Sequence, residues 1–346
     1  MAKLGVGVIG VGRMGRRHAE NLRFNVHNAE LVAVADVDSK AARELAAELG
    51  IEHSYGSTEA LLSQINVDAV VIASPPKFHV PALQAAASAG KHIFCEKPLA
   101  LRLAEVDEVE TAVERAGVLL QVGFMRRYDP PYIEAQRRIT AGEIGEPVIF
   151  KAIGRDREPP PLSYFKSGSG TLFVDASIHE FDLARWLMKD EVAEVHAFGG
   201  AVACPDIGQC GDLDAGIVNL RFTRGAIGNV ENFRQSRYGY DIATEVVGTK
   251  ATLRIGYLQQ TALTLLTDEH VSHDVVDHFL VRFKEAYLSE IQDFVQRVLA
   301  DQSPSVSVQD ARKALAIALA AESSYREHRP IKVSSGMGVG QLAPHS

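Results

Sequence analysis

One glycine-rich segment near the N-terminus constrains the fold of this chain more than any other feature. Residues 4–9 are apolar and rich in Val, which is typical of a buried parallel strand. Gly10, Gly12 and Gly15 follow with the spacing G-x-G-x-x-G, and the pattern over 13–22 predicts a helix. A glycine turn between a strand and a helix is the context in which this motif indicates dinucleotide binding.

Each glycine has a separate role in this interpretation. Gly10 allows a tight turn, Gly12 lets a pyrophosphate approach the backbone, and Gly15 lets the helix pack close to the strand. The free N–H groups at the start of the helix then face the phosphates. Arg13 and Met14 lie in the same turn, and we expect them beside the bound cofactor.

An acidic residue ends the second predicted strand, which covers residues 29–35. Asp36 lies about 20 residues beyond the glycines, where a carboxylate accepts hydrogen bonds from a ribose 2′-OH and repels a 2′-phosphate. The sequence therefore favours NAD over NADP, although Arg13 could also attract a phosphate. The alternative for this whole region is an ordinary glycine-rich turn followed by a surface Asp.

The composition excludes several classes of function. A chain of 346 residues suggests about two domains. Its net charge of −8 gives no basic surface for nucleic acid or an anionic membrane, and no apolar run approaches the ~18 residues of a membrane span. Cys95, Cys204 and Cys210 lack the spacing of a zinc site or a disulfide framework, and we see no signal-peptide pattern. We therefore expect a cytoplasmic protein without a metal site.

Strands and helices alternate through the first third of the chain. Apolar strands are predicted over 69–73, 92–95 and 118–122, with helices between them. This alternation predicts a parallel sheet, and ligands bind beyond the carboxyl ends of such strands. The residues after these strands are therefore expected to contact the cofactor, namely Ser74, Pro75, His79, Glu96 and Lys97. The alternatives are a packing role for His79 and a solvated surface position for Lys97.

The pattern changes near residue 123. A Pro-, Ser- and Gly-rich loop covers 156–170, and loops of that length are often functional. From residue 192 the chain is rich in strands joined by short connections, which predicts a large, mainly antiparallel open sheet. We therefore expect an α/β Rossmann dinucleotide-binding domain over 1–123, an α+β domain over 124–333 and a flexible tail over 334–346.

One predicted helix, over 173–188, carries a candidate catalytic pair. Asp175 and His179 are four residues apart, so both should point to the same helix face. An Asp beside a His can orient the imidazole and support its charged form. His179 is then a candidate general base for a hydroxyl proton, and Lys97 would hold the same oxygen. The alternative is an ordinary helical ion pair; a metal site lacks further convincing ligands.

Together these motifs resemble the Gfo/Idh/MocA oxidoreductase family. The resemblance rests on GVGRMG, Asp36, Ser74-Pro75 with His79, Glu96-Lys97-Pro98 and Asp175-x-x-x-His179-x-x-Asp182, and it runs from about residue 4 to about residue 333. Within the family, FMRRYDPPY, VDASIHEFDLARWL and RYGYDI are similar to inositol 2-dehydrogenases.

The resemblance implies an activity and a site. Members of that subgroup oxidise a ring hydroxyl of myo- or scyllo-inositol to an inosose with NAD. Lys97, Asp175 and His179 match the family's catalytic set, and Arg127 and Tyr238 match positions near the polyol. In GRDRE (154–158), where related enzymes can offer a His, we expect Arg155 to contact the substrate. The expected substrate contacts are thus Lys97, Arg127, Arg155, Asp175, His179 and Tyr238.

Two other functions and one assembly state follow from the same reasoning. A pyranose sugar dehydrogenase is a second enzymatic reading, because a pyranose resembles inositol in ring shape. A regulator that binds NAD or sugar without catalysis is a third, although the intact Lys97, Asp175 and His179 set argues against it. An open sheet face needs covering, and the resemblance also implies a homotetramer.

Overall fold

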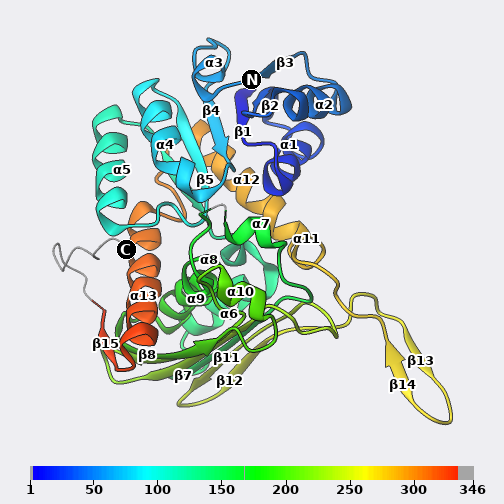
Figure 1. Ribbon diagram of the computed structural model, residues 1–346, viewed down its shortest axis with the longest axis vertical. Coiled ribbons are helices and arrows are strands. Elements are labelled where there is room, and N and C mark those ends of the chain that lie inside the picture. The colour runs from blue at the N-terminus through cyan, green and yellow to red at the C-terminus, as the bar shows by residue number, and fades with distance from the viewer. Residues whose placement is uncertain (1–2, 167, 334–346) are drawn as a thin grey trace.

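The computed structural model describes residues 3–166 and 168–333, which form two sheets with helices around and between them (Figure 1). The first sheet is wholly parallel and has the strand order β3-β2-β1-β4-β5-β6. Its strands are β1 (Leu4–Ile9), β2 (Ala29–Ala35), β3 (His53–Tyr55), β4 (Ala69–Ile72), β5 (His92–Glu96) and β6 (Leu120–Gly123). This order confirms the Rossmann prediction for the N-terminal domain.

Helices cover both faces of this sheet, because its central strands are apolar on both sides. All six residues of β1 are buried. The covering elements are α1 (Arg13–Phe24), α2 (Ser39–Leu49), α3 (Thr58–Leu62), η1 (Pro76–Phe78), α4 (His79–Ser88) and α5 (Leu103–Ala116). The ends of α2 follow from its sequence: the Asp38 side chain accepts from two free backbone N–H groups, and Gly50 ends the helix with φ +62°.

A helix from the C-terminal part of the chain completes the first domain. After α11 (Phe279–Arg282), the helix α12 (Lys284–Leu299) buries Ile291, Phe294 and Val295 in the same hydrophobic cluster as β1. The rings of Phe94 and Phe294 lie 5.8 Å apart. The expected division at residue 123 is therefore incomplete, because a segment far along the chain supplies part of the Rossmann core.

The second sheet is mixed and has the order β12-β11-β7-β10-β9-β8-β15. Neighbouring strands are antiparallel except for the parallel pair β7 and β10, which confirms a mainly antiparallel sheet. Its strands are β7 (Pro147–Arg155), β8 (Val192–Gly200), β9 (Ala215–Phe222), β10 (Ile227–Phe233), β11 (Asp241–Gly248), β12 (Thr252–Gly256) and β15 (Ile331–Lys332).

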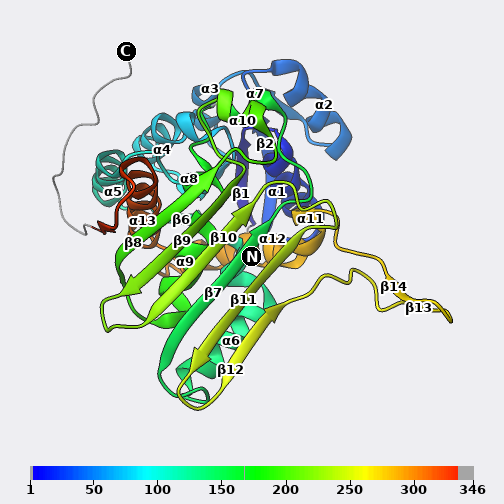
Figure 2. The same cartoon turned by 60° about the horizontal axis from the view of Figure 1, so that its bottom comes forward.

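The helices of the described residues cover one face of this sheet (Figure 2). Along β9, buried and exposed residues alternate, and a Cβ added at the buried Gly216 would meet Leu172 and Phe173. The helices on that face are α6 (Pro130–Thr140), α8 (Leu172–Asp175), α9 (Ile178–Met188) and α13 (Val308–Glu327). The opposite face exposes Ile217 and Ile227 within the chain.

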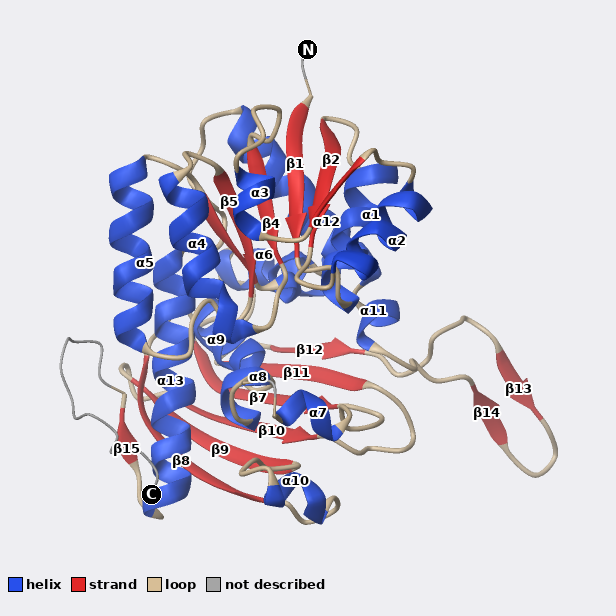
Figure 3. Ribbon diagram, turned by 45° about the horizontal axis from the view of Figure 1, so that its top comes forward, coloured by secondary structure: helices blue, strands red, loops and turns tan. Residues whose placement is uncertain are grey.

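A hairpin extends away from the body of the molecule (Figure 3). Its strands β13 (Thr264–Leu266) and β14 (Val271–His273) pair with each other and lie outside the large sheet. The remaining short elements are η2 (Met125–Tyr128), α7 (Leu162–Phe165) and α10 (Pro205–Gln209). The tail expected over 334–346 lies outside the described residues. Within the described ranges, every helix is too short or too polar to cross a membrane.

Candidate active site

The glycine turn after β1 has the geometry that the motif predicts. Gly10 has φ +89°, and a Cβ there would lie 2.5 Å from the backbone nitrogen of Ser74. A Cβ at Gly15 would lie 1.7 Å from the Gly10 carbonyl oxygen, so only glycine lets α1 approach the turn this closely. A Cβ at Gly12 would meet no protein atom within 4 Å. The turn thus leaves open space in front of Gly12, at the N-terminus of α1.

Asp36 lies against this turn. Its Oδ2 accepts from the Val11 backbone N–H at 2.8 Å, and its Oδ1 accepts from the Asp38 N–H at 2.9 Å. Each carboxylate oxygen keeps a further lone pair for a ribose hydroxyl. Arg13 instead extends toward α11, where it lies 3.3 Å from Nε2 of His278. Met14 is partly buried against the hydrophobic core.

Both ring nitrogens of His79 face backbone carbonyl groups of the protein, and the expected cofactor contact stays a prediction. Its Nδ1 lies 2.9 Å from the Pro98 carbonyl oxygen and its Nε2 lies 2.7 Å from that of Ser74. Burial lowers the pKa of His79, and a neutral imidazole donates through only one nitrogen. One of these two carbonyl groups therefore accepts a hydrogen bond from the ring, which lies between the segments after β4 and β5. Pro98 follows a cis peptide bond, while Pro75 precedes η1.

The Glu96 carboxylate turns into the interior, and its expected role in cofactor binding stays a prediction. It lies 2.7 Å from Nε2 of His18, and both side chains are buried. Glu290 of α12 completes this cluster with a carboxyl group that is 0% exposed and has no hydrogen-bond partner in the described structure. Burial, with Glu96 nearby, raises the pKa of Glu290 well above its ordinary value. The cluster fixes the residue that precedes Lys97.

Lys97 and Asp175 meet between the two domains. The Lys97 ammonium donates to the Asp175 carbonyl oxygen at 2.6 Å and to Oδ1 at 3.2 Å. Lys97 lies just after β5 of the first sheet, and Asp175 ends α8 beside the second sheet. An ammonium has three N–H donors, so one remains for a ligand.

Two residues that the sequence analysis missed also hold the Asp175 carboxylate. The Tyr164 hydroxyl donates to Oδ1 at 2.9 Å, and both terminal nitrogens of Arg234 lie 3.2 Å from Oδ2. Burial alone would raise the pKa of Asp175, but Lys97, Arg234 and Tyr164 outweigh that effect and hold the pKa below its ordinary value. The only sequence signal was the length of the loop that carries Tyr164.

His179 lies near Lys97 but does not bond to Asp175, which corrects the expected pair. The predicted helix breaks: α8 ends at Asp175 and α9 begins at Ile178, so the spacing of four no longer fixes one face. No hydrogen bond joins the two side chains in the described ranges, and Nδ1 of His179 is buried without a partner. Burial, then Lys97 and Arg126, lower the pKa of His179 well below its ordinary value. The imidazole is therefore neutral at neutral pH, as a general base requires.

Asp156 adds a carboxylate to the same region. It directly follows β7, is partly exposed, and has no side-chain hydrogen bond to any described residue. Burial raises its pKa to about 6, and Asp175 and Arg234 are among the charges that it senses. This side chain is an available acceptor for a hydroxyl donor.

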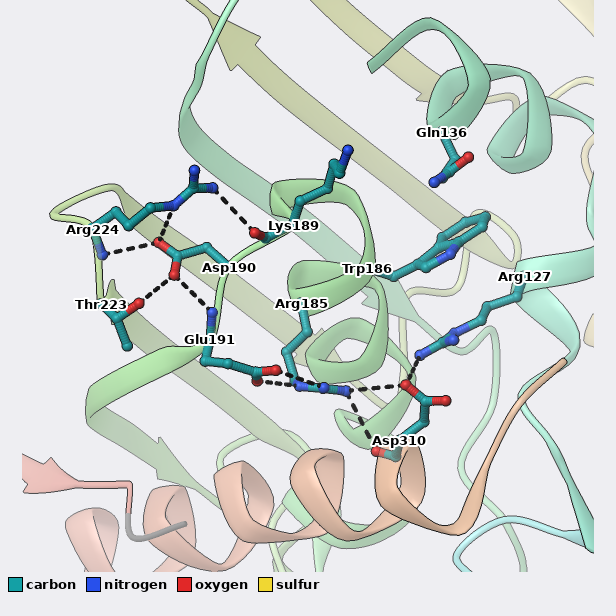
Figure 4. A pocket seen from close by; sticks show the side chains of 10 residues that line it. All are labelled: Arg127, Gln136, Arg185, Trp186, Lys189, Asp190, Glu191, Thr223, Arg224 and Asp310. Atoms are coloured by element: carbon teal, nitrogen blue, oxygen red, sulfur yellow. Dashed lines mark hydrogen bonds and ion pairs between the residues drawn. The ribbon is translucent and has the colours of Figure 1, made fainter. Parts of the chain in front are cut away.

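Arg127 lies in a different pocket from the one expected (Figure 4). Its guanidinium donates to both carboxylate oxygens of Asp182 and to Asp310 at 3.0 Å, and it lies over the Trp186 ring. That pocket is lined by residues of α9, α13 and their surroundings, and it includes neither Lys97 nor His179. With its donors directed at two carboxylates, Arg127 links α9 to α13, and its expected contact with substrate stays a prediction.

Arg155 and Tyr238 contact each other but lie apart from the catalytic cluster. The Arg155 guanidinium donates to the Tyr238 hydroxyl at 2.8 Å and to Glu231 at 2.7 Å. A Cβ at the preceding Gly154 would meet Glu180 of α9, and successive strand residues face opposite sides of the sheet. Arg155 therefore points to the open face, away from α9. Its expected role in binding substrate stays a prediction.

Comparison with known proteins agrees with this architecture. The chain is 39% identical over 335 residues to the myo-inositol 2-dehydrogenase of Thermotoga maritima, covering 96% of this chain and 99% of that protein. It is 41% identical over 326 residues to the scyllo-inositol 2-dehydrogenase (NAD(+)) of Bacillus subtilis, covering 94% and 95%. The structure of a Lactobacillus casei scyllo-inositol dehydrogenase with bound NAD(H) and scyllo-inositol superposes with a TM-score of 0.90, at 29% identity, covering 96% and 100%.

Two family models account for most of both domains. The model described as an oxidoreductase family with an NAD-binding Rossmann fold matches residues 4–124. The model of the GFO/IDH/MocA C-terminal domain matches residues 132–254. Since both halves and the full-length relatives agree, the chain belongs to the GFO/IDH/MocA oxidoreductase family.

Proposed function

We propose that this protein is an NAD-dependent dehydrogenase that oxidises a ring hydroxyl of myo- or scyllo-inositol to the inosose. The carrying observation is the contact between Lys97 of the first domain and Asp175 of the second, with His179 at the start of the next helix. Relatives named for these activities cover almost the whole chain. One group thus holds the reacting oxygen, and a neutral imidazole accepts its proton.

The residues around the glycine turn fit NAD. Open space before Gly12, free N–H groups at the start of α1 and the carboxylate of Asp36 suit a pyrophosphate and an unphosphorylated ribose. The relatives agree, since one is named for NAD(+) and another structure contains NAD(H). Bound NAD supplies the hydride acceptor, and the protein supplies position and proton transfer.

Lys97 and His179 have different roles in the same step of the mechanism. Lys97, with two donors held by Asp175, directs its remaining N–H toward the substrate hydroxyl oxygen. His179 removes the proton of this hydroxyl group as the hydride leaves the carbon atom that bears the group. The Lys97 cation stabilises negative charge that develops on the oxygen. The Asp156 carboxylate accepts a hydrogen bond from another hydroxyl of the ring and so selects a polyol.

Formation of NADH from a panel of substrates tests this function. The purified protein should reduce NAD with myo- or scyllo-inositol at much higher kcat/KM than with glucose or galactose, and the Lys97→Met variant should be nearly inactive. A preference for a pyranose would identify a sugar dehydrogenase instead. NAD binding without turnover of any cyclitol or sugar would identify a regulator.

We also propose that the protein is a homotetramer assembled through the open face of the second sheet. Ile217 and Ile227 are exposed there, and helices cover only the other face. Light scattering should give four times the chain mass, and Ile217→Asp combined with Ile227→Asp should lower it. Leu265→Asp on the hairpin is the matched control. A monomer mass for the wild type would contradict this assembly.

For localisation we propose the cytoplasm. Cys95, Cys204 and Cys210 are all free thiols, which suits a reducing compartment. Fractionation of cells that express the tagged full chain tests this, and recovery in an oxidising compartment would contradict it.

A further inference from the structure

We propose that Arg234 and Tyr164 are positioning residues that set the direction of the Lys97 ammonium through the Asp175 carboxylate. This inference rests on the proposed function. It concerns two residues from separate parts of the chain, the end of β10 and the long loop over 156–170. The hydrogen bonds that connect them to Lys97 run through Asp175, so we expect their effect on the reaction to pass through that residue.

The contacts around Asp175 leave its carboxylate one orientation. Oδ1 accepts from Lys97 and Tyr164, and Oδ2 accepts from both terminal nitrogens of Arg234. The Lys97 ammonium also donates to the main-chain oxygen of the same residue. Because two of its three donors are fixed in this way, the third has a defined direction. Rotation of the carboxylate would release Lys97 from Oδ1.

Arg234 is itself held tightly, so it can act as a fixed reference. It is 2% exposed and lies 3.5 Å from Oδ2 of Asp212. The other oxygen of Asp212 accepts from the backbone N–H of Leu172 at 2.7 Å. Leu172 begins α8 and Asp175 ends it, so Arg234 is tied to both ends of this short helix.

Tyr164 connects the long loop over 156–170 to the surroundings of Asp175. It lies in α7, and the next residue, Phe165, packs its ring against the Arg234 guanidinium at 5.1 Å. Two neighbouring residues of one helical turn thus contact the carboxylate and its cation. These two residues complete the surroundings of Asp175. Substituting them should lower kcat more than it lowers the affinity for the cofactor.

The charges around Asp175 explain why its carboxylate needs Arg234 as a second cation beside Lys97. Three carboxylates, on Asp156, Asp175 and Asp212, face this region, together with Lys97, Arg234 and the Tyr164 hydroxyl. With Arg234 removed, the Asp175 carboxylate would keep Lys97 on Oδ1 and lose the positive charge that contacts Oδ2. Asp175 would then hold a proton at a higher pH and lose its attraction for Lys97. The kcat of the variant would then fall at acidic pH, whereas the kcat of the wild type would not.

Steady-state kinetics of variants test the proposal. Arg234→Met should lower kcat about 100-fold with little change in the KM for inositol, and add an acid limb to kcat. Arg234→Lys should recover part of the rate because it restores the charge. Tyr164→Phe should lower kcat about threefold to tenfold, as expected for one lost hydrogen bond. Arg254→Met, at an exposed arginine of the same sheet, is the control and should keep wild-type rates.

Two measurements separate positioning from a structural role and from failure of the proposed function. NAD affinity and melting temperature should stay near wild type in Tyr164→Phe, and crystal structures of Arg234→Met should show Lys97 displaced from Asp175. The structures need no substrate, so they test positioning even if inositol proves not to be the substrate. Unchanged kcat, an undisturbed Lys97–Asp175 contact, or parallel losses of NAD affinity and kcat would each overturn the proposal.

Discussion

The Lys97 ammonium lies 2.6 Å from the main-chain oxygen of Asp175 and 3.2 Å from its carboxylate. The first residue belongs to the cofactor edge of the parallel sheet, and the second ends a helix on the other sheet. This contact therefore places the proposed chemistry at the junction of the domains. Neither domain alone contains both groups.

Replacing the general base should affect the rate but not the pH profile near neutrality. A positioned base contributes ~10²–10⁴-fold, so His179→Ala should lower kcat by about that factor while NAD binding persists. Burial, Lys97 and Arg126 keep the pKa of His179 well below its ordinary value, so the imidazole is neutral at neutral pH and above. Stopped-flow or steady-state kinetics from pH 5 to 9 check this, with His270→Ala as control. Loss of a limb near pH 6.5 in the variant would contradict it.

Substrate binding should depend on the ionisation of Asp156. Its pKa of about 6 is raised by burial, so the carboxylate is protonated at pH 5 and charged at pH 7. The charged form is the stronger acceptor, and the KM for inositol should therefore fall as pH rises through this window. Asp156→Asn should raise KM about tenfold at pH 7 and remove the dependence. The matched control is Asp268→Asn on the hairpin; a KM unaffected by Asp156→Asn would exclude this contact.

Cofactor preference should depend on Asp36. Asp36→Ser removes the carboxylate that would repel a 2′-phosphate, so the ratio of kcat/KM for NAD to that for NADP should fall by at least about tenfold. The Val11 N–H, which donates a hydrogen bond to Asp36, would lose this acceptor. Some loss of kcat/KM with NAD is therefore also expected. Asp38→Ser, which changes a helix cap, is the control. Equal use of NADP by the wild type would refute the role assigned to Asp36.

Glu290 should make folding stability fall as pH rises. Its raised pKa means that the folded protein keeps a proton that the unfolded chain releases above about pH 4.5. Stability is lost at about 1.4 kcal/mol per pH unit from there up to the folded pKa. Glu290→Gln carries no such charge, so urea unfolding should show it more stable than wild type at pH 8 and similar at pH 4. Glu285→Gln, exposed on the same helix, is the control; a destabilised Glu290→Gln at pH 8 would show that Glu290 is ionised.

Local rules determined much of the fold and half of the site. The spacing of Gly10 and Gly15 reflects backbone constraints within one turn, and Asp36 and Lys97 directly follow strands whose direction the alternation defines. Such features depend on a few consecutive residues, so the sequence alone predicted the parallel sheet, the cofactor edge and the position of Lys97. The short connections between the later strands likewise predicted the mainly antiparallel sheet.

Only the tertiary structure decided how the charged side chains pair. The spacing of Asp175 and His179 suggested one helix face, but the helix breaks and Asp175 instead binds Lys97, Tyr164 and Arg234. Lys97 and Arg234 are 78 and 59 residues away from it in sequence. Arg127 likewise binds Asp182 and Asp310 outside the site. A buried charge takes whichever opposite charge folding brings near it, and that neighbour depends on the packing of the two domains, which no local spacing encodes.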